Sequence, residues 1–549
     1  ELFSEKLDSS VAEEVSRFSR LYYHVTPVDE LEERRIDNIY GATLSCWHFI
    51  QQLDPGTAKL RVFNPDVEQH GWHSNHTVIE VLNSDMPFLV DSVRMELNRQ
   101  GLSIHAIHNA IVNVKRDPEG KLLQVIDRDQ ATPECRRESA IYLEVDRRSD
   151  QNALQKISAD LQDALNDVRA AVKDYSQILE RVKETVLSLK KTPKAINKAE
   201  VAEAQAFLEW LLEDHFTFLA ADEVELTKEG NGVAIRRVEG SELGTARLHR
   251  PRRPKKLLEH LRDNERSFIE TPQPLMFGKD AHRSRIHRPV YRDLVVVKRF
   301  DAKGKVIGEQ RFYGLYTSPV YDMPPANIPI VRLKVAELTA RTYFEPGGHS
   351  SKELQQVIKD LPREELFLAT PDGLFDTALG IFNLQERRKV RLFIRPDPCG
   401  KFFSCLYYAP RDIYSTDLRH RVQQVLENHF GALDTEFTTH FSESVLARTH
   451  FIMRVDPDAS PEWDVQSLQA LEELHSALIE SCGEEQGNRY TSLYRGAFPS
   501  AYREHFTPSS AVYDVQRLAE IDSGKPLAMS FYRVLEETSE LLRFKLLHE

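Results

Sequence analysis

The chain has 549 residues, a formal net charge of −13, 29% charged residues and 41% hydrophobic residues. This length allows about three or four domains with separate cores, and the acidic balance argues against nucleic acid as a partner. No apolar run approaches the ~20 residues that cross a bilayer, and no signal peptide is visible. The five cysteines are scattered without CxxC pairs, which is typical of reduced thiols. We therefore expect a multidomain cytoplasmic protein that has no membrane segment.

Residues 1–70 are assigned to an N-terminal helical segment, and a strand–helix–strand pattern follows it. The apolar run Val78–Leu82 is typical of a strand that is covered by helices. We expect Asp85 to cap the next helix and Pro87 to lie in its first turn. The helix is marked by an apolar stripe and a glycine stop, at Leu89, Val93, Leu97 and Gly101.

A second strand begins at Ile104, a polar loop covers 127–138, and a third strand is expected at Ala140–Val145. A long helix is expected from about Asp150 to Leu189, because its apolar residues recur at spacings of three and four. This helix packs either against another module or subunit, or along its own chain as a helical arm. Together residues 71–195 resemble a ferredoxin-like module of the ACT type, a small fold that usually senses amino acids.

Residues 196–322 have a different pattern, with a helix expected over Val201–Phe218 and a hairpin around Gly230 and Gly232. A further helix is expected near Lys256–Asp263, and strands at Ile286–Phe300 and Lys305–Leu315. The apolar Leu294–Val297 predicts a central strand, whereas the charged Lys298 and Arg299 are expected to emerge into solvent. This antiparallel set resembles a PAS-type sensor fold.

The remaining residues predict a helical connector over 323–385, with helices at Val331–Thr342 and Ser350–Ile358, and a second ACT-like unit over 386–460 with β-β-α-β-β order. A helical segment over 461–525 follows, with helices at Ser467–Glu480 and Ser509–Glu520. Two strands in 526–549 look like the start of a third ACT-like unit. Because a sheet that stops there has an unpaired edge, we expect the natural protein to continue past Glu549. The predicted fold class is therefore α+β multidomain, with ACT-like modules, a PAS-like antiparallel module and helical connectors.

Two blocks of sequence, Ser284–Ser318 and His76–Asp117, strongly resemble the large NAD-specific glutamate dehydrogenases of bacteria. The resemblance spans essentially the whole chain. It implies an N-terminal regulatory and oligomerisation region with ACT-like and PAS-like modules, in a homo-oligomer whose glutamate and NAD sites lie further toward the C-terminus. The expected partner of this region is its own C-terminal catalytic region. The alternative is a free-standing amino-acid-sensing scaffold that acts on a separate partner.

The residues themselves predict no catalytic, cofactor or metal site. The sole G-x-G motif, Gly230 to Gly232, lies in a hairpin turn and lacks the third glycine of a dinucleotide loop. His70, His73 and His76 recur every third residue, but no cysteine or carboxylate cluster accompanies them. The basic run from Arg247 to Lys256 predicts a solvated surface, with an anion or RNA site as the alternative.

Two candidate ligand sites remain. The first is the turn before the predicted helix, where helix N-terminal amides could hold the carboxylate of an effector, at Asp85, Met86, Pro87, Phe88 and Asp91. Phe88 replaces the glycine that is common in amino-acid-binding ACT modules, so a packing or oligomerisation role is the alternative. The second is an anion site at Arg285, His287 and Arg288, for which structural pairing is the alternative.

Overall fold

The computed structural model describes residues 2–24, 26–130, 132–230, 232–248, 255–384, 387, 390–412, 414–442, 444–456, 484–494, 498, 502, 506, 508–522, 527–532 and 543–548. The chain divides into two compact units. The first unit contains Glu1–Arg262 and Ile269–Val320, and the second contains Asp263–Phe268 and Tyr321–Glu549. None of the helices in these described ranges is long and apolar enough to span a membrane.

The first unit opens with a five-stranded antiparallel sheet of order β1-β2-β5-β3-β4. Its strands are β1 (Lys59–Phe63), β2 (Thr77–Ser84), β3 (Ile104–Arg116), β4 (Leu122–Ile126) and β5 (Arg136–Val145). Strand β5 lies between β2 and β3, as in a ferredoxin-like split βαβ unit. Strand β1 pairs with the free side of β2, so the segment predicted to be only helical up to residue 70 also supplies an edge strand. The predicted loop over 127–138 is shorter, because β5 already begins at Arg136.

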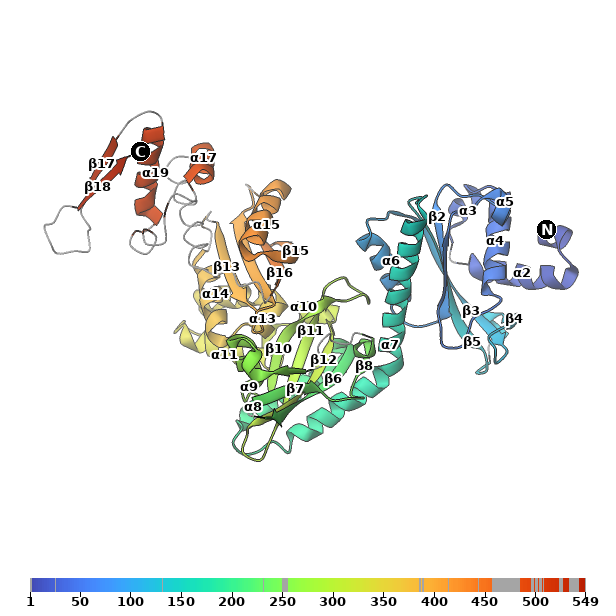
Figure 1. Cartoon of the computed structure of the whole chain (residues 1–549), viewed down its shortest axis with the longest axis horizontal. Coiled ribbons are helices and arrows are strands. Elements are labelled where there is room, and N and C mark those ends of the chain that lie inside the picture. The colour runs from blue at the N-terminus through green and yellow to red at the C-terminus, as the bar shows by residue number, and fades with distance from the viewer. Residues whose placement is uncertain are drawn as a thin grey trace. The chain divides into compact units, whose positions relative to one another are not determined.

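Helices cover both faces of this sheet (Figure 1). On one face, Val78, Leu82 and Tyr142 pack against α2 and α4 through residues such as Phe18 and Phe49. On the other face, strand residues such as Ile79 and Leu143 pack against α6 and α7. The helices are α1 (Leu2–Lys6), α2 (Ser9–Tyr22), α3 (Val28–Glu32), α4 (Ile36–Ile50), α5 (Val67–His70), α6 (Leu89–Arg99) and α7 (Gln151–Leu189). The prediction that the Val78–Leu82 strand is covered by helices is confirmed.

The start of α6 differs from the prediction. Its N-cap is Phe88, which has a left-handed backbone (φ 70°, ψ 0°) and no side chain that can accept a capping hydrogen bond. The expectation that Asp85 caps this helix is wrong, because Asp85 pairs with Arg137 of β5 instead (2.9 Å). Pro87 lies in the turn ahead of the helix and not in its first turn. The stripe of Leu89, Val93 and Leu97 is buried as predicted.

Helix α7 is a single helix of 39 residues, with the side chain of Asp150 accepting hydrogen bonds from the backbone at its start. Its N-terminal half packs against α6 and β1, and its C-terminal half against β6 and β8 of a second sheet. Buried residues run along its whole length, from Leu154 to Leu189. The predicted extent of the helix is confirmed, and within this chain it packs against two modules.

The second sheet of the first unit is antiparallel, with the order β10-β11-β12-β6-β7-β9, and β8 pairs with β6. Its strands are β6 (Phe216–Glu229), β7 (Gly232–Arg237), β8 (Leu243–Gly244), β9 (Lys255–Leu257), β10 (Leu275–Arg283), β11 (Tyr291–Phe300) and β12 (Val306–Tyr316). Helices α8 (Lys198–Trp210) and α10 (Ser318–Asp322) flank it in sequence, and α9 (Asp263–Glu270) spans a boundary of the two units. The predicted central position of Leu294–Val297 is confirmed, because β11 is paired on both sides.

Three predictions in this region are wrong. Phe216–Phe218 belongs to β6 and not to a helix, since α8 ends at Trp210. The helix expected near Lys256–Asp263 is wrong in extent: only Leu258–His260 form a short 3-10 helix between β9 and α9, which begins at Asp263. Lys298 does not emerge into solvent: it is buried and pairs with Glu309, which stands directly opposite on β12. A buried ammonium is stable only with such a partner, and the carbonyl of Ile269 accepts a further hydrogen bond at 3.0 Å.

The second unit contains a four-stranded antiparallel sheet of order β13-β14-β16-β15. Helix α15 covers one face, where Phe403, Phe451 and Phe430 form part of the core. The elements are α11 (Val331–Arg341), α12 (His349–Asp360), α13 (Arg363–Leu368), α14 (Pro371–Leu384), β13 (Arg391–Pro396), β14 (Phe402–Pro410), α15 (Thr416–Phe430), β15 (Ala432–Phe441) and β16 (Leu446–Val455). The predicted β-β-α-β-β order is confirmed, with Gly431 in the left-handed position that ends α15.

The other face of this sheet is joined to α13 by a buried ionic network. Glu365 accepts hydrogen bonds from Arg395 (2.7 and 2.8 Å) and from the hydroxyl of Ser404 (2.6 Å), and His450 lies 3.8 Å away. Burial alone would raise the pKa of Glu365, but Arg395 and these hydrogen bonds lower that pKa to about 2. The carboxylate therefore remains charged inside the protein.

Further along the chain the structure describes α17 (Glu484–Tyr494), α19 (Pro508–Asp522) and the antiparallel pair β17 (Leu527–Tyr532) and β18 (Arg543–His548). The predicted helix over Ser509–Glu520 is confirmed as α19. The predicted helix at Ser467–Glu480 lies outside the described residues.

The buried face of α7 predicts a large effect of truncation. Leu161 is fully buried in the core that the first sheet shares with α6, whereas Leu187 on the same helix is 57% exposed. We expect Leu161→Ala to destabilise the first unit by about 2–5 kcal/mol and Leu187→Ala by less than about 0.5 kcal/mol. Urea unfolding followed by tryptophan fluorescence tests this, because Trp47, Trp72 and Trp210 all belong to the first unit. Equal shifts for both variants would contradict the packing.

The Glu365 network predicts a stability that depends on acid pH. Because the pKa of Glu365 falls to about 2 in the folded chain, its contribution is present above its unfolded pKa of about 4.3 and is lost as the pH falls toward 2. We expect the second unit to lose on the order of 3 kcal/mol across this range. Hydrogen exchange of β14 and β16 peptides, corrected for intrinsic rates, measures the loss. Glu365→Gln should be less stable than the wild type at pH 6, and its stability should change less with pH below pH 4. Wild-type protection from hydrogen exchange that is the same at pH 3 as at pH 6 would refute the role of Glu365.

Candidate functional site

The two candidate ligand sites predicted from the sequence meet in the first unit. One is the turn between β2 and α6, which contains Phe88, and the other is the loop between β10 and β11, which contains His287. The loop reaches α6, and its Ile286 is buried in the core that α6 and α7 form with the first sheet. The contact therefore joins the two sheets of the unit.

The β10–β11 loop is shaped by hydrogen bonds of its own. The backbone N–H of Ser284 donates to the carbonyl of Val290 (2.9 Å), which closes the loop. The Ser284 hydroxyl accepts from the N–H of Ile286 (3.0 Å) and donates to its carbonyl (2.8 Å). These bonds fix Ile286 inward, and His287 follows with a left-handed backbone (φ 66°).

His287 makes three contacts with the start of α6. Its ring packs against the ring of Phe88, with the centroids 5.3 Å apart. Its backbone N–H donates to the hydroxyl of the buried Ser92 (3.3 Å). Its Nδ1 lies 3.5 Å from the carboxylate of Asp91, at ion-pairing distance but without hydrogen-bond geometry. Phe88 and Asp91, predicted for the first site, thus form one cluster with His287, which was predicted for the second.

The other predicted residues have different partners. Asp85 pairs with Arg137 (2.9 Å), and Arg285 pairs with Asp163 of α7 (3.1 Å). Arg288 donates to the backbone carbonyl of Tyr316 on β12. Met86 packs at the edge of the shared core, and Pro87 is exposed. Arg285, His287 and Arg288 therefore point to different partners and do not converge on one anion.

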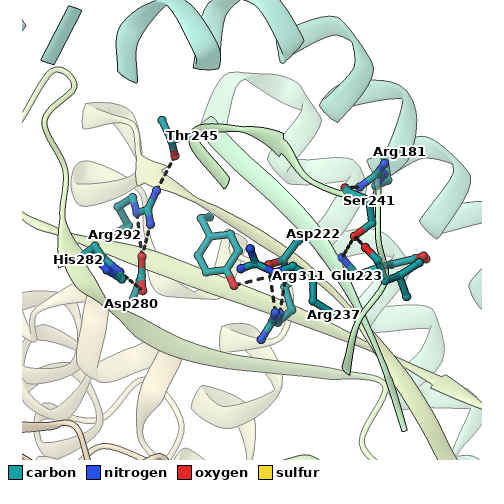
Figure 2. A network of polar contacts seen from close by, with 12 residues as sticks. Arg181, Asp222, Glu223, Arg237, Ser241, Thr245, Asp280, His282, Arg292 and Arg311 are labelled. Carbon is teal, nitrogen blue, oxygen red and sulfur yellow. Dashed lines mark hydrogen bonds and ion pairs between the residues drawn. The ribbon is translucent and has the colours of Figure 1, made fainter. Parts of the chain in front are cut away.

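A second polar site lies on the second sheet, on the face that does not contact α7 (Figure 2). The buried carboxylate of Asp222 accepts from Arg311 (2.7 and 3.0 Å) and pairs with Arg237 (2.6 Å). The hydroxyl of Tyr313 lies 3.5 Å from the same carboxylate. Two guanidinium nitrogens of Arg237, Nε and one Nη, are buried and have no hydrogen-bond partner among the described residues. The cluster therefore has one more positive than negative charge.

A neighbouring ion pair continues this network across the sheet. Arg292 binds Asp280 and donates to the hydroxyl of Thr245 (2.6 Å), while Nδ1 of His282 lies 3.3 Å from Asp280 (Figure 2). Burial alone would raise the pKa of Asp280, but Arg292 and His282 hold it below its ordinary value. Arg292 also lies over the ring of Tyr313, 5.3 Å from its centroid. The two ion pairs are thus linked through one tyrosine.

Polar groups on α7 bind this sheet at several points. Asp174, which is buried on the helix, accepts from the backbone N–H of Gly244 (2.8 Å) and from Arg247. Gly244 has a backbone of φ 61°, and a Cβ there would lie 2.2 Å from the carbonyl oxygen of Leu219, so no other residue fits. Further along, Arg181 donates to the carbonyl of Ser241 and Thr185 donates to Gln310 (2.8 Å). These residues were not predicted from the sequence; their signal was a set of polar side chains on the buried stripe of a helix.

The only G-x-G motif does not fit a dinucleotide. Gly230 and Gly232 flank the turn between the antiparallel strands β6 and β7, so no helix N-terminus follows them. His70 and His76 have different partners: His70 pairs with Asp66 (3.5 Å) and His76 with Glu144 (3.2 Å). Among the described residues, no group of three or more histidine, cysteine, aspartate or glutamate side chains is placed to hold a metal ion.

Four family models match the chain. Residues 18–161 match the ACT1 domain of glutamate dehydrogenase, and residues 391–477 match its ACT2 domain. Residues 328–387 match helical motif 1, and residues 477–521 match helical motif 2. The first match contains the β2–α6 turn with Phe88, and helical motif 1 contains α11 to α14.

Curated relatives match most or all of the chain. An NAD-specific glutamate dehydrogenase of Halomonas elongata is 44% identical over 100% of this chain and 35% of the relative. The protein of the same description from Pseudomonas aeruginosa is 40% identical over 99% of this chain and 34% of the relative. One from Mycobacterium tuberculosis is 25% identical over 81% of this chain and 27% of the relative.

The chain spans about one third of the length of these relatives, 35% and 34% for the first two. The family models and these relatives agree on every matched segment. The chain therefore belongs, as a segment, to the large NAD-specific glutamate dehydrogenases, and it contains that family's ACT1 and ACT2 domains and both of its helical motifs.

Proposed function

We propose that this chain is the N-terminal regulatory and assembly region of an NAD-dependent glutamate dehydrogenase. The longer protein would convert glutamate, NAD and water to 2-oxoglutarate, ammonia and NADH, and this region would act on its own C-terminal catalytic region in a cytoplasmic homo-oligomer. The observation that carries the proposal is the 44% identity along the entire chain to an NAD-specific glutamate dehydrogenase. The NAD site would lie outside this chain, because the only G-x-G motif here does not fit a dinucleotide.

The second sheet of the first unit is a PAS-like module in this proposal. The support is its strand order, in which an N-terminal hairpin (β6, β7) lies beside a C-terminal antiparallel triplet (β10, β11, β12). The first and the last of these strands, β6 and β12, are neighbours in the middle of the sheet. The segment between β7 and β10 contributes the short helical elements that a PAS fold has at this point.

The cluster of Phe88, Asp91 and His287 is the proposed point at which the ACT1 module and the PAS-like module affect each other. An amino-acid or carboxylate effector at the β2–α6 turn would alter the start of α6, which His287 contacts through its ring, its N–H and its Nδ1. The Phe88 side chain occupies part of this turn by packing on His287. The effector would therefore bind at Asp85, Met86 and the exposed Pro87 and act through Phe88.

The first prediction concerns catalysis. The 549-residue chain should produce no NADH from glutamate and NAD, whereas a protein of the relatives' full length should do so. Absorbance at the NADH band after mixing the chain with both substrates provides the measurement. NADH formation by the purified chain would overturn the assignment of catalysis to another region.

The second prediction concerns the cluster. In the full-length enzyme, His287→Ala should weaken the response of the reaction rate to amino-acid effectors, because it removes contacts that link the two modules. The effector concentration that gives half of the response should rise about 5- to 150-fold. The rate without effector should remain unchanged. His73→Ala, at an exposed histidine of the same unit, is the matched control. An effector response that survives His287→Ala intact would exclude transmission through this cluster.

A further inference from the structure

The second unit contains a pocket of about 610 Å³ between the helical motif and the sheet of the ACT2 domain. Helices α12 and α14 form one side, and strands β14, β15 and β16 form the other. This volume lies within the range of roughly 300–1,000 Å³ that is usual for small-molecule sites. The pocket belongs to neither of the sites described above.

One wall of the pocket carries an arginine, Arg448, for which the described part of the chain supplies no anionic partner. Arg448 on β16 donates to the backbone carbonyl of Asp360, the last residue of α12, and the described residues supply no carboxylate to it. Its Nε is buried and has no hydrogen-bond partner among these residues. A buried cationic donor without a partner is unfavourable, and an anionic ligand would satisfy it. The hydroxyl of Tyr408, directly opposite on β14, also hydrogen-bonds the guanidinium. The partners of Arg448 among the described residues are thus neutral groups, and a carboxylate in the pocket would add an anionic one.

Two serines beside Arg448 add further donors. The Ser442 hydroxyl oxygen accepts from the N–H of Ser444 (3.2 Å), and the Ser444 hydroxyl oxygen accepts from the N–H of Leu446 (3.2 Å). Because each oxygen accepts from the backbone, the proton of each hydroxyl can be donated to a ligand. His440, which stands directly opposite Arg448 on β15, completes this side.

The other wall has the opposite charge. Glu353 and Asp360 of α12 line it, and the Asp360 carboxylate is oriented by Gln356 (2.9 Å). The lining also has apolar members on both sides, Val357 of α12, Phe382 of α14 and Leu446 of β16, and the two sides meet where Arg448 bonds the carbonyl of Asp360. A molecule that carries a carboxylate, an ammonium group and an apolar side chain would find a complement for each of its parts.

We propose that this pocket binds a free amino acid with an apolar side chain. The ligand carboxylate binds Arg448 and the two serine hydroxyls, and the ammonium group faces the carboxylates of α12. The side chain packs on the apolar lining. Such a ligand joins α12 of the helical motif to β16 of the ACT2 domain, so its binding stabilises the second unit. This site is independent of the function proposed above for the β2–α6 turn.

The test uses the 549-residue chain and isothermal titration with L-valine, L-leucine, L-isoleucine, L-methionine and L-phenylalanine. For L-leucine the comparison ligand is 3-methylbutylamine, which has the same side chain and amine but no carboxylate. The diagnostic variant is His440→Glu. Because His440 is exposed and opposite Arg448, a carboxylate there pairs with the guanidinium and competes with the ligand without disturbing the core. His440→Gln is the matched neutral control.

We expect at least one of the five amino acids to bind, with an affinity at least tenfold lower in His440→Glu and within twofold of the wild type in His440→Gln. The amine should bind at least tenfold more weakly than L-leucine. No binding by any of the five, equal affinity in wild type and His440→Glu, or an amine that binds as well as L-leucine would each overturn the site. Binding that His287→Ala alters but His440→Glu does not would place the ligand at the β2–α6 turn and reject this pocket.

Discussion

The first unit depends on the continuous buried face of α7. A helix of 39 residues is about 58 Å long, and buried side chains occur from Leu154 to Leu189. The N-terminal half is held mainly by apolar contacts with α6 and the first sheet, together with the ion pair of Asp163 and Arg285. The C-terminal half is held at Asp174, Arg181 and Thr185 by directional hydrogen bonds to the second sheet. Because one continuous helix makes both sets of contacts, the positions of the two sheets along it are fixed. The β10–β11 loop is thereby brought against α6.

Buried ionic groups are the second constraint. Asp222 and Glu309 are each buried with an arginine or lysine from a neighbouring strand, and Glu365 of α13 is buried with Arg395 of β13. Such pairs add little net stability over apolar residues of the same size, but losing one partner costs about 3–5 kcal/mol. They therefore act mainly on specificity: a strand that slipped by one residue would leave a buried charge unpaired. In sheets of mostly apolar strands, these pairs exclude wrong registers.

How well the sequence predicted the structure depended on the kind of signal. Helices α6 and α7 were predicted within a few residues, because each has an apolar stripe and a defined end. Strands β1, β4 and β10 were missed, since short edge strands and strand pairs without a tight turn have little local pattern. Lys298 was misplaced because its partner, Glu309, is identified only by the register of β12. Phe88, Asp91 and His287 were chosen as candidates from local motifs, but their contact across the chain follows from tertiary packing alone. The pocket at Arg448 was not predicted, because its lining comes from two helices, three strands and the loop before β16.

The contact between Phe88 and His287 joins two residues with left-handed backbones (φ 70° and 66°), neither of which is glycine. A left-handed conformation costs a residue with a side chain on the order of 1 kcal/mol. Phe88 is held in it by the first hydrogen bond of α6, from the N–H of Ser92 (3.0 Å), and His287 by the loop that buries Ile286. Both conformations persist only while the shared core holds the two loops together. A ligand that relaxed the β2–α6 turn would release this strain on one side and remove the support of His287 on the other. If the turn binds an effector as proposed, this coupling would make the contact more sensitive to the ligand than an unstrained interface of equal area.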